Sequence, residues 1–331
     1  MSRAFRAAAP VRLDLAGGWT DVPPFSAREG GLVVSAAIGL YAHAEVRVGG
    51  TGLRLVAEDM DAKLDLADES ALTPEGPLAL LQAALRLLPV GACALTTRSD
   101  VPPGSGLGSS GALDVALVAA LSAARGEPRE AVELAQLACR LERVEAGIAG
   151  GRQDQYTAAF GGVLRMEFRD PHAVVEPLAL DPALLAELER RMLLVYTGAS
   201  RFSGATIGRV MAAYERGDHG VTAALHGLRE VSGRMVEALQ AGDLARIGAL
   251  LDRNWRHQQT LDPGMCTPFM ARLGQAIGQA GALGGKAAGS GAGGAMFFLG
   301  PDDPAPAAAA ARALGATLLP VRWAAAGVRP C

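Results

Sequence analysis

A run of glycine and serine, PPGSGLGSS at residues 102–110, leads directly into an alanine- and leucine-rich helix predicted at 111–124. A loop of this kind leaves several backbone N–H groups unpaired at the positive end of the helix dipole. These groups suit a phosphate, and glycine lets the backbone approach it closely. Ser109 and Ser110 by themselves could simply cap the helix, but the whole run favours a phosphate-binding loop.

Two established phosphate-binding patterns fit the chain only in part. The pattern G-x-G-x-x-G occurs at 106–111 and again at 289–294. About twenty residues after the first match, Glu127 and Glu130 lie at a predicted helix start instead of a strand end, and the second match enters a strand. The P-loop pattern fails because Lys286 is followed by alanine. We therefore disfavour a dinucleotide site and expect phosphate binding without a P-loop lysine.

Charge and composition limit the classes of partner. The chain has 331 residues, half of them hydrophobic, and a net charge of −3. This charge provides no basic field for nucleic acid or an anionic membrane, and no apolar run reaches the length of a membrane span. We expect a small-molecule ligand, no nucleic-acid partner and no membrane. A homodimer is left open beside a monomer.

The cysteines and the N-terminus favour the cytoplasm. The four cysteines form no C-x-x-C pair, so neither a disulfide framework nor a zinc site is indicated. Pro10 and Asp14 interrupt the N-terminal segment before the apolar stretch of a signal peptide can form. These cysteines are Cys93, Cys139, Cys266 and Cys331.

Strands and helices mix along the chain without strict alternation, which favours an α+β architecture. Short strands are predicted within 9–48, and an acidic, proline-containing stretch at 169–185 indicates a boundary between two lobes, 1–170 and 171–331. A final strand is predicted at 316–323. The main predicted helices are 78–88, 111–124, 221–241, 244–261 and 268–280.

Three ordered motifs resemble those of the GHMP small-molecule kinases, the family that includes galactokinase and mevalonate kinase. PPGSGLGSSGA resembles the second family motif, APVRLDLAGGWTD the first and GGKAAGSGAGGAMFFL the third. Ser290 and Ala292 stand where the third motif usually has an alanine and a glycine. AGGWTDVPPF, GRQDQYTAAFGG and LDPGMCTPF are most similar to the branch that acts on D-glycero-D-manno-heptose 7-phosphate, although His257 and Gln258 replace paired lysines of that branch.

The resemblance implies an S5-like N-terminal lobe and a ferredoxin-like C-terminal lobe, with the active site in the cleft between them. It implies an ATP- and Mg²⁺-dependent kinase that phosphorylates the anomeric C1 hydroxyl of the heptose 7-phosphate, for nucleotide-activated heptose and surface polysaccharide synthesis. An L-fucose or other sugar 1-kinase is the alternative. A regulatory protein that binds nucleotide without turnover is a further hypothesis, against which Asp154, Glu142 and Ser110 argue.

The resemblance also implies roles for particular residues. Asp154 would orient or deprotonate the acceptor hydroxyl, and Arg12 would pair with it. Ser110 and Glu142 would bind Mg²⁺. Taken alone, Asp154 could cap a loop, and Glu142 could be a solvated side chain paired with Arg140 or Arg143. The expected nucleotide-binding residues are Pro103, Gly104, Ser105, Gly106, Leu107, Gly108, Ser109, Ser110 and Gly291.

A sugar phosphate needs hydroxyl-binding groups and cationic groups. Asp21 is the predicted partner of sugar hydroxyls, because a short acidic side chain on a loop is a directional acceptor. Trp19 would shape the same pocket or belong to the core. The arginines expected near the distal phosphate would otherwise be surface residues. The expected substrate residues are Trp19, Thr20, Asp21, Arg28, Gly151, Arg152 and Arg201.

Overall fold

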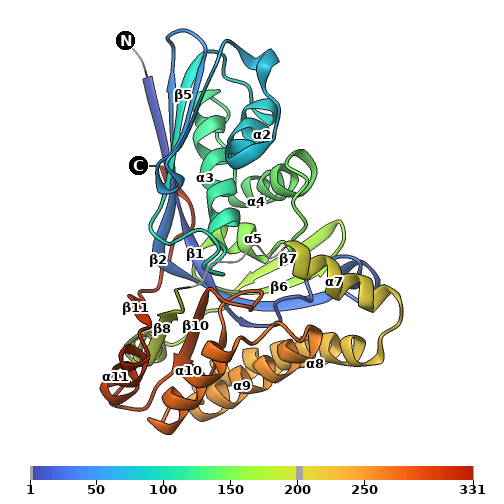
Figure 1. Cartoon of the computed structure of the whole chain (residues 1–331), viewed down its shortest axis with the longest axis vertical. Helices are drawn as coiled ribbons and strands as arrows, with labels where there is room; N and C mark the ends of the chain where they lie inside the picture. Colours follow the sequence, from blue (N-terminus) through green and yellow to red (C-terminus); the bar gives the residue numbers. More distant parts are fainter. Residues whose placement is uncertain (1–2, 199–203, 331) are drawn as a thin grey trace.

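The computed structural model describes residues 3–198 and 204–330, which form two sheets with helices packed around them (Figure 1). The larger sheet has the strand order β12-β1-β2-β5-β3-β4, and β6 and β7 extend it from β2. Only β3 and β5 pair in parallel; the other pairs described are antiparallel. Its strands are β1 (Arg3–Ala16), β2 (Gly31–Val48), β3 (Leu53–Ala57), β4 (Ala62–Leu66), β5 (Cys93–Ser99), β6 (Val163–Arg169), β7 (His172–Pro177) and β12 (Arg329–Pro330).

The long strand β2 organises this sheet because its two halves have different neighbours. Residues 42–48 pair with β5, and residues 31–36 pair with β6, while β1 runs along nearly the whole length of β2. A register shift interrupts β1 between Pro10 and Val11. The end of β1, which carries part of the first motif, is buried.

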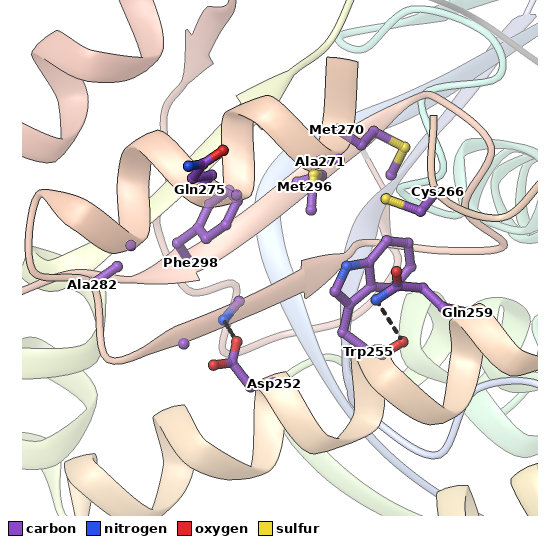
Figure 2. A pocket seen from close by; sticks show the side chains of 14 residues that line it. Asp252, Trp255, Gln259, Cys266, Met270, Ala271, Gln275, Ala282, Met296 and Phe298 are labelled. Atoms are coloured by element: carbon purple, nitrogen blue, oxygen red, sulfur yellow. Dashed lines mark hydrogen bonds between the residues drawn. The ribbon is translucent and has the colours of Figure 1, made fainter. Parts of the chain in front are cut away.

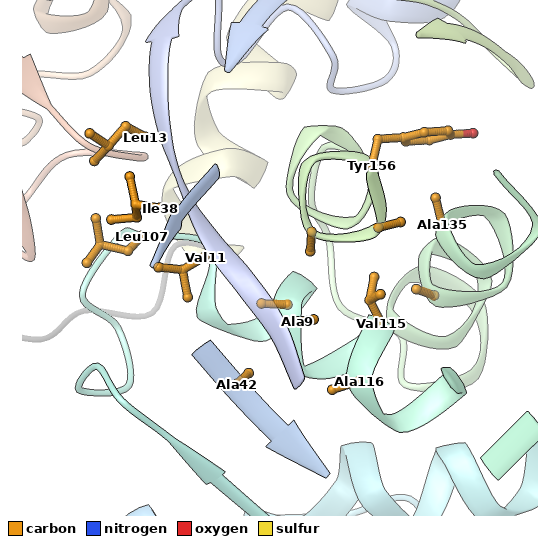
Figure 3. Close-up of a cluster of buried hydrophobic side chains, with 14 of the residues drawn as sticks. Ala9, Val11, Leu13, Ile38, Ala42, Leu107, Val115, Ala116, Ala135 and Tyr156 are labelled. Carbon is orange, nitrogen blue, oxygen red and sulfur yellow. The ribbon is translucent and has the colours of Figure 1, made fainter. Parts of the chain in front are cut away.

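Helix α3 (Ser109–Ala124) packs against β1 and β2 and is surrounded by other helices. Figure 3 shows Val115 and Ala116 of this helix in a cluster with Ala9 and Val11 of β1. Small side chains allow this close approach of helix and sheet. The neighbouring helical elements are α1 (Phe25–Arg28), α2 (Ala79–Leu87), α4 (Ala131–Arg140), the π-helical turn η4 (Leu141–Glu145), α5 (Gln153–Phe160) and the 3₁₀ turns η1 (Glu58–Met60), η2 (Glu69–Ala71) and η3 (Gly76–Leu78).

The second sheet is antiparallel, with the order β11-β8-β10-β9. If these four strands are numbered 1 to 4 in chain order, their order in the sheet is 4-1-3-2. This is the ferredoxin-like arrangement that the resemblance implies. Its strands are β8 (Met192–Tyr196), β9 (Gly284–Ala287), β10 (Ala295–Leu299) and β11 (Thr317–Leu319). Its helices are α6 (Pro182–Arg191), α7 (Gly204–Glu215), α8 (His219–Ala241), α9 (Leu244–Leu261), α10 (Pro268–Gln279) and α11 (Ala305–Ala313).

The main predicted helices are confirmed to within two residues, and the predicted helix at 244–261 matches α9 at both ends. The strand expected at 316–323 is shorter, because only β11 pairs with the second sheet and the chain then returns to the first sheet as β12. The hairpin of β3 and β4 and the helix α5 were not predicted. Strand β7 also extends the first sheet past residue 170.

Two further expectations concern cysteines and membranes. Cys93, Cys139 and Cys266 are free thiols, and Cys331 lies outside the described residues. Within residues 3–198 and 204–330, no helix has both the length and the apolar character needed to cross a membrane.

Candidate active site

A cavity of about 530 Å³ lies where the end of β1, the glycine–serine loop and the loop before β10 meet. Of the predicted residues, it brings together Arg12, Asp21, Ser110, Glu142 and Asp154. These side chains come from segments far apart in the chain, and the fold places them around one space. The other predicted residues on its wall are Trp19, Pro103, Gly104, Gly106, Gly108, Ser109, Gly151 and Gly291.

Arg12 is the central link of this site. Its Nε donates to Asp154 Oδ1 at 2.8 Å, and its Nη1 donates to the carbonyl oxygens of Gly106 at 2.6 Å and Ala288 at 2.8 Å. Burial alone would lower the pKa of Arg12, but Asp154 raises it, and the net shift is upward. A permanent positive charge therefore joins the carboxylate, the glycine–serine loop and the loop before β10.

Asp154 lies in the first turn of α5, where the helix dipole favours a negative charge. Its side chain is 24% exposed, so it faces the cavity while remaining paired with Arg12. The simple alternative of a loop-capping aspartate does not describe this position. The geometry suits a carboxylate that accepts a hydrogen bond, or a proton, from a hydroxyl group.

The glycine–serine loop and the loop before β10 pack directly on each other. Gly108 is the N-cap of α3 and has φ +73°, in the left-handed region that favours glycine. Ala295 N donates to Ser105 O at 2.7 Å, and a Cβ at residue 294 would overlap that same carbonyl group. The expected packing of the two motifs against each other is therefore present.

Two residues of the glycine–serine loop have a supporting role in place of the nucleotide contact that we predicted. Ser105 and Leu107 are fully buried and do not line the cavity. The carbonyl oxygen of Leu107 accepts from Arg12 N at 2.9 Å, and its side chain lies in the core cluster. Their predicted contact with the nucleotide is thus corrected: both hold the loop in place from behind.

Glu142 is almost completely buried, although it lies at the end of α4 in the turn η4. Gln155 Nε2 donates to its Oε2 at 2.6 Å, and Ser110 also hydrogen-bonds to it. Burial, together with the nearby Asp154 carboxylate, raises the pKa of Glu142 to about 7. A cation bound beside Glu142 would stabilise the ionised form of this buried carboxylate.

The alternative interpretation of Glu142 as a solvated, arginine-paired side chain is wrong. Arg140 pairs instead with Glu145 at 2.9 Å, and the nearest ion-pair partner of Arg143 is Asp170 at 3.9 Å. Among the described residues, no group of three or more His, Cys, Asp and Glu side chains forms a metal cage. Mg²⁺ does not need one, because it keeps waters and binds one or two carboxylates together with substrate phosphates. Ser110 and Glu142 therefore fit Mg²⁺.

Asp114 is a second buried carboxyl group that sequence analysis missed. Its Oδ2 accepts from Gln155 Nε2 at 3.3 Å, and its Oδ1 has no hydrogen-bond partner. Burial and the Glu142 charge raise its pKa well above the usual value. A signal was present, because Asp114 is the one acidic residue in the apolar segment SSGALDVALVAALSAA.

The turn at 17–21, after β1, presents Trp19 and Asp21 to the cavity. Asp21 Oδ2 accepts from the backbone N–H groups of Arg152 at 2.7 Å and Gln153 at 2.9 Å. Its Oδ1 is buried without a partner, and burial is the main cause of its raised pKa. A Cβ at residue 151 would overlap this carboxylate, so the contact needs glycine at this position.

Gln153 is a cavity residue that we did not predict. It immediately precedes Asp154, and its Oε1 is buried with no hydrogen-bond partner. The indole Nε1 of Trp19 is also buried without a hydrogen-bond partner. Buried polar atoms are rarely left unpaired, so these two atoms and Asp21 Oδ1, which belong to residues that line this end of the cavity, are candidate partners for the polar groups of a ligand.

Several predicted substrate residues do not reach the cavity. Thr20 is buried and its hydroxyl bonds to Gly17 O at 2.7 Å, so it supports the turn. Arg152 pairs with Asp170 at 2.7 Å, donates to Pro171 O and His172 O, and lies over the Phe168 ring.

Arg28 is likewise directed elsewhere. It lies over the Tyr214 ring and pairs with Glu215 at 3.8 Å. The predicted phosphate contacts of Arg28 and Arg152 are therefore corrected, and Arg201 lies outside the described residues.

The other end of the cavity is largely apolar and was not predicted. It is formed by η1, η3, the start of α2 and the end of β5, together with Leu113 of α3. These four elements contain none of the three family motifs. The side chains in question are Met60, Pro77, Leu80, Leu81 and Leu113, with Asp59, Thr97, Arg98 and Ser99 beside them.

A smaller cavity of about 300 Å³ lies between α9, α10 and the strands β9 and β10 (Figure 2). Its wall includes Trp255, Met270, Met296 and Phe298, and Asp252 accepts from Gly285 N at 2.8 Å. None of the predicted site residues lines this smaller cavity. The chemistry expected from the motifs is concentrated in the larger one.

Comparison with known proteins identifies the family of this chain. The GHMP kinases N terminal domain family matches residues 77–162, and the GHMP kinases C terminal family matches residues 235–318. The chain belongs to the GHMP kinases. It is thus an enzyme, a phosphotransferase with an alcohol group as acceptor.

Individual relatives cover nearly the whole chain. D-glycero-alpha-D-manno-heptose 7-phosphate kinase of Campylobacter jejuni is 31% identical over 89% of this chain and 89% of its own length. The bifunctional fucokinase/GDP-fucose pyrophosphorylase of Arabidopsis thaliana is 30% identical over 88% of this chain but only 29% of its own length. A crystal structure of a D-glycero-D-manno-heptose 1-phosphate kinase from Bacteroides thetaiotaomicron superposes with a TM-score of 0.80 at 28% identity, covering 99% of this chain and 98% of that one.

Proposed function

We propose that this protein is an ATP-dependent sugar kinase that phosphorylates the anomeric C1 hydroxyl of D-glycero-D-manno-heptose 7-phosphate to give the 1,7-bisphosphate. The observation that carries the proposal is the Arg12–Asp154 pair, which lies between the glycine–serine loop and a pocket end rich in unpaired polar atoms. The relatives named for heptose phosphates support the choice of sugar. Such an enzyme would contribute to nucleotide-activated heptose and surface polysaccharide synthesis.

The nucleotide would occupy the loop and the apolar end of the cavity. Backbone N–H groups at the start of α3 donate to its phosphates, and the apolar side chains beyond Leu113 enclose its base. Ser110 and Glu142 would hold Mg²⁺, which would neutralise negative charge of the nucleotide phosphates. The guanidinium of Arg12 lies beside the loop and stabilises negative charge that develops during transfer.

The acceptor hydroxyl would lie against Asp154. Its carboxylate orients the hydroxyl and takes its proton as the new O–P bond forms. Because Arg12 holds one carboxylate oxygen, the group has a fixed orientation toward the cavity.

The sugar hydroxyls would satisfy the unpaired atoms of the pocket. Asp21 Oδ1 and Gln153 Oε1 accept hydrogen bonds, and Trp19 Nε1 donates one. This mixture of two acceptors and one donor matches an array of hydroxyl groups. An analogue that lacks one hydroxyl would leave a buried polar atom unpaired and bind more weakly.

An L-fucose or other sugar 1-kinase is the second candidate function, and a specific observation favours it. The described cationic side chains of the cavity are Arg12 and Arg98, and Arg98 lies at the apolar end with Thr97 and Ser99. The described part of the sugar end therefore provides no arginine for a distal phosphate, and Arg28 and Arg152 are committed elsewhere. The fucokinase relative agrees with this alternative.

The test is ADP formation with Mg²⁺ and a panel of sugars: the heptose 7-phosphate, mannose, fucose and galactose. Asp154→Asn is the control variant. Turnover on the heptose phosphate alone, lost in the variant, supports the proposal. Preference for fucose supports the second candidate, and equal ATP hydrolysis with and without every sugar contradicts both. Nucleotide binding without any turnover would instead support a regulatory protein.

A further inference from the structure

Lys286 is a fully buried lysine whose ammonium group reaches from β9 of the second sheet to β1 of the first. Its Nζ donates to Asp14 Oδ2 at 2.7 Å and to the carbonyl oxygen of Asp14 at 2.6 Å. The exposed fraction of the two side chains is 0% for Lys286 and 3% for Asp14. A buried ion pair adds little net stability compared with apolar side chains of similar size. Stability alone therefore gives no reason for this pair.

The second oxygen of the Asp14 carboxylate connects the pair with the 17–21 turn. Asp14 Oδ1 accepts from Gly18 N at 3.1 Å, and a Cβ at residue 18 would overlap the carboxylate. Gly18 directly precedes Trp19, which lines the cavity. Lys286 thus holds one oxygen of Asp14, while the other oxygen holds the turn.

The turn needs such restraint because of the conformation of Trp19. This residue has φ +82°, a region that residues other than glycine rarely adopt. Strained residues keep their conformation only when surrounding bonds hold them. Besides Asp14, the restraints on the turn include Asn254 Oδ1, which accepts from Gly17 N at 3.0 Å, and the hydroxyl of Thr20, which donates to Gly17 O.

We propose that Asp14, whose buried charge is balanced by Lys286, is a positioning residue that holds the 17–21 turn in the shape required for substrate binding. Lys286 pairs with Oδ2, and Oδ1 accepts from Gly18 N. The turn then places Trp19 and Asp21 on the wall of the sugar end of the cavity. This inference rests on the proposed function only for the identity of the ligand.

Two double variants separate the hydrogen bond from the charge pair. Asp14→Asn with Lys286→Met removes both charges but retains an oxygen that can accept from Gly18 N. Asp14→Leu with Lys286→Met removes both charges and that oxygen. Each leaves no unpaired buried charge, so both are expected to fold. If the leucine variant gives no cooperative melt, Asp14→Ala with Lys286→Met, smaller at the first position, replaces it.

The first readout does not depend on any substrate. In a background with Trp255→Phe and Trp323→Phe, Trp19 is the remaining tryptophan of the three in the chain. Acrylamide quenching of its fluorescence is expected to rise several-fold in the leucine variant and to stay near the background value in the asparagine variant. Equal quenching in both double variants, whether low or high, would overturn the proposal, because the Gly18 hydrogen bond would then have no separate effect.

The second readout is kinetic and uses the sugar that the wild-type enzyme turns over. The leucine variant is expected to have a sugar KM about tenfold above that of the asparagine variant, since small displacements of binding groups have large effects. The KM for ATP should be equal in the two. If the wild type turns over no sugar, the proposed function fails, while the quenching result still decides the role of Asp14.

Discussion

Arg12 and Asp154 are 142 positions apart in the chain, yet Nε of the one lies 2.8 Å from Oδ1 of the other. Arg12 also holds the backbone of both glycine-rich loops, whereas Asp154 contacts neither loop through a described hydrogen bond. We therefore propose that the two residues differ in function: Arg12 would connect catalysis with the nucleotide loops, and Asp154 would serve the acceptor hydroxyl.

This difference predicts distinct kinetics for two variants. Asp154→Asn should lower kcat by a factor of about 10² to 10⁴, the usual contribution of a general base, with little change in the KM for ATP. Arg12→Lys should lower kcat and also raise the KM for ATP, because lysine cannot replace all three hydrogen bonds. Steady-state kinetics at varied ATP check this. An unchanged ATP KM in Arg12→Lys would refute the linking role.

Gln153 should contribute to sugar binding and not to stability. Its buried Oε1 is unpaired, so Gln153→Met should leave the melting temperature unchanged or higher, while kcat/KM for the sugar falls by about tenfold or more. The matched control is Gln258→Met. Gln258 Nε2 donates to Gly289 O at 2.6 Å, so its loss should lower the melting temperature. Equal kinetics for Gln153→Met and wild type would remove Gln153 from the binding site.

Arg152 should be structural, contrary to the prediction from sequence. Arg152→Met removes an ion pair with Asp170 and two hydrogen bonds to backbone carbonyl groups. The free energy of unfolding should fall by about 3 kcal/mol, as expected when one partner of a buried pair is removed. Urea unfolding measures this change. The ratio of KM for a phosphorylated sugar to that for its unphosphorylated form should not change, and a selective rise would restore Arg152 as a phosphate ligand.

The metal-free protein should become less stable as the pH rises through the titration range of Glu142. Burial, followed by the Asp154 charge, raises the pKa of Glu142 from 4.5 to about 7, so the folded state retains a proton that the unfolded state has lost. Below about pH 4.5 both states are protonated and no difference arises from this group. Between the two values the free energy of unfolding should fall by about 3 kcal/mol.

Denaturant unfolding without Mg²⁺, at several pH values, tests this dependence. Glu142→Gln should flatten it, although Asp114, whose pKa is also raised, retains a slope of the same sign. Added Mg²⁺ should stabilise the wild type more at the higher pH, because the metal binds the ionised carboxylate. A pH profile that is unchanged in Glu142→Gln would show that this carboxyl group does not titrate as described.

Ala292 should be a site where glycine stabilises the fold. It has φ +63° in the loop before β10, where the family motif usually has a glycine, and its N–H donates to Met265 O at 2.6 Å. Ala292→Gly relieves left-handed strain and should raise the free energy of unfolding by up to about 1 kcal/mol. Thermal unfolding checks this, with Ala287→Gly on the neighbouring strand as the opposite, destabilising control.

Much of this protein could be predicted from residues that are close together in the chain. The glycine–serine run and the apolar segment after it predicted α3 and its loop, because backbone freedom and dipole direction are local properties. The helices α8, α9 and α10 followed from apolar periodicity. The motif residues Arg12, Asp21, Glu142 and Asp154 carry their chemistry in their side chains, and the structure brings these four to one cavity.

The tertiary structure alone decided which polar groups remain free to bind a ligand. Arg152 and Gln153 are neighbours in one motif, yet packing directs the arginine to Asp170 and leaves the glutamine on the cavity wall with its amide oxygen unpaired. The sequence around Lys286 does not match the P-loop pattern. Only the packing of the two sheets shows that Lys286 pairs with Asp14. Burial and hydrogen-bond partners depend on segments distant in the chain, whereas residue type and local pattern do not. That is why the sequence determined the chemistry and the fold determined its availability.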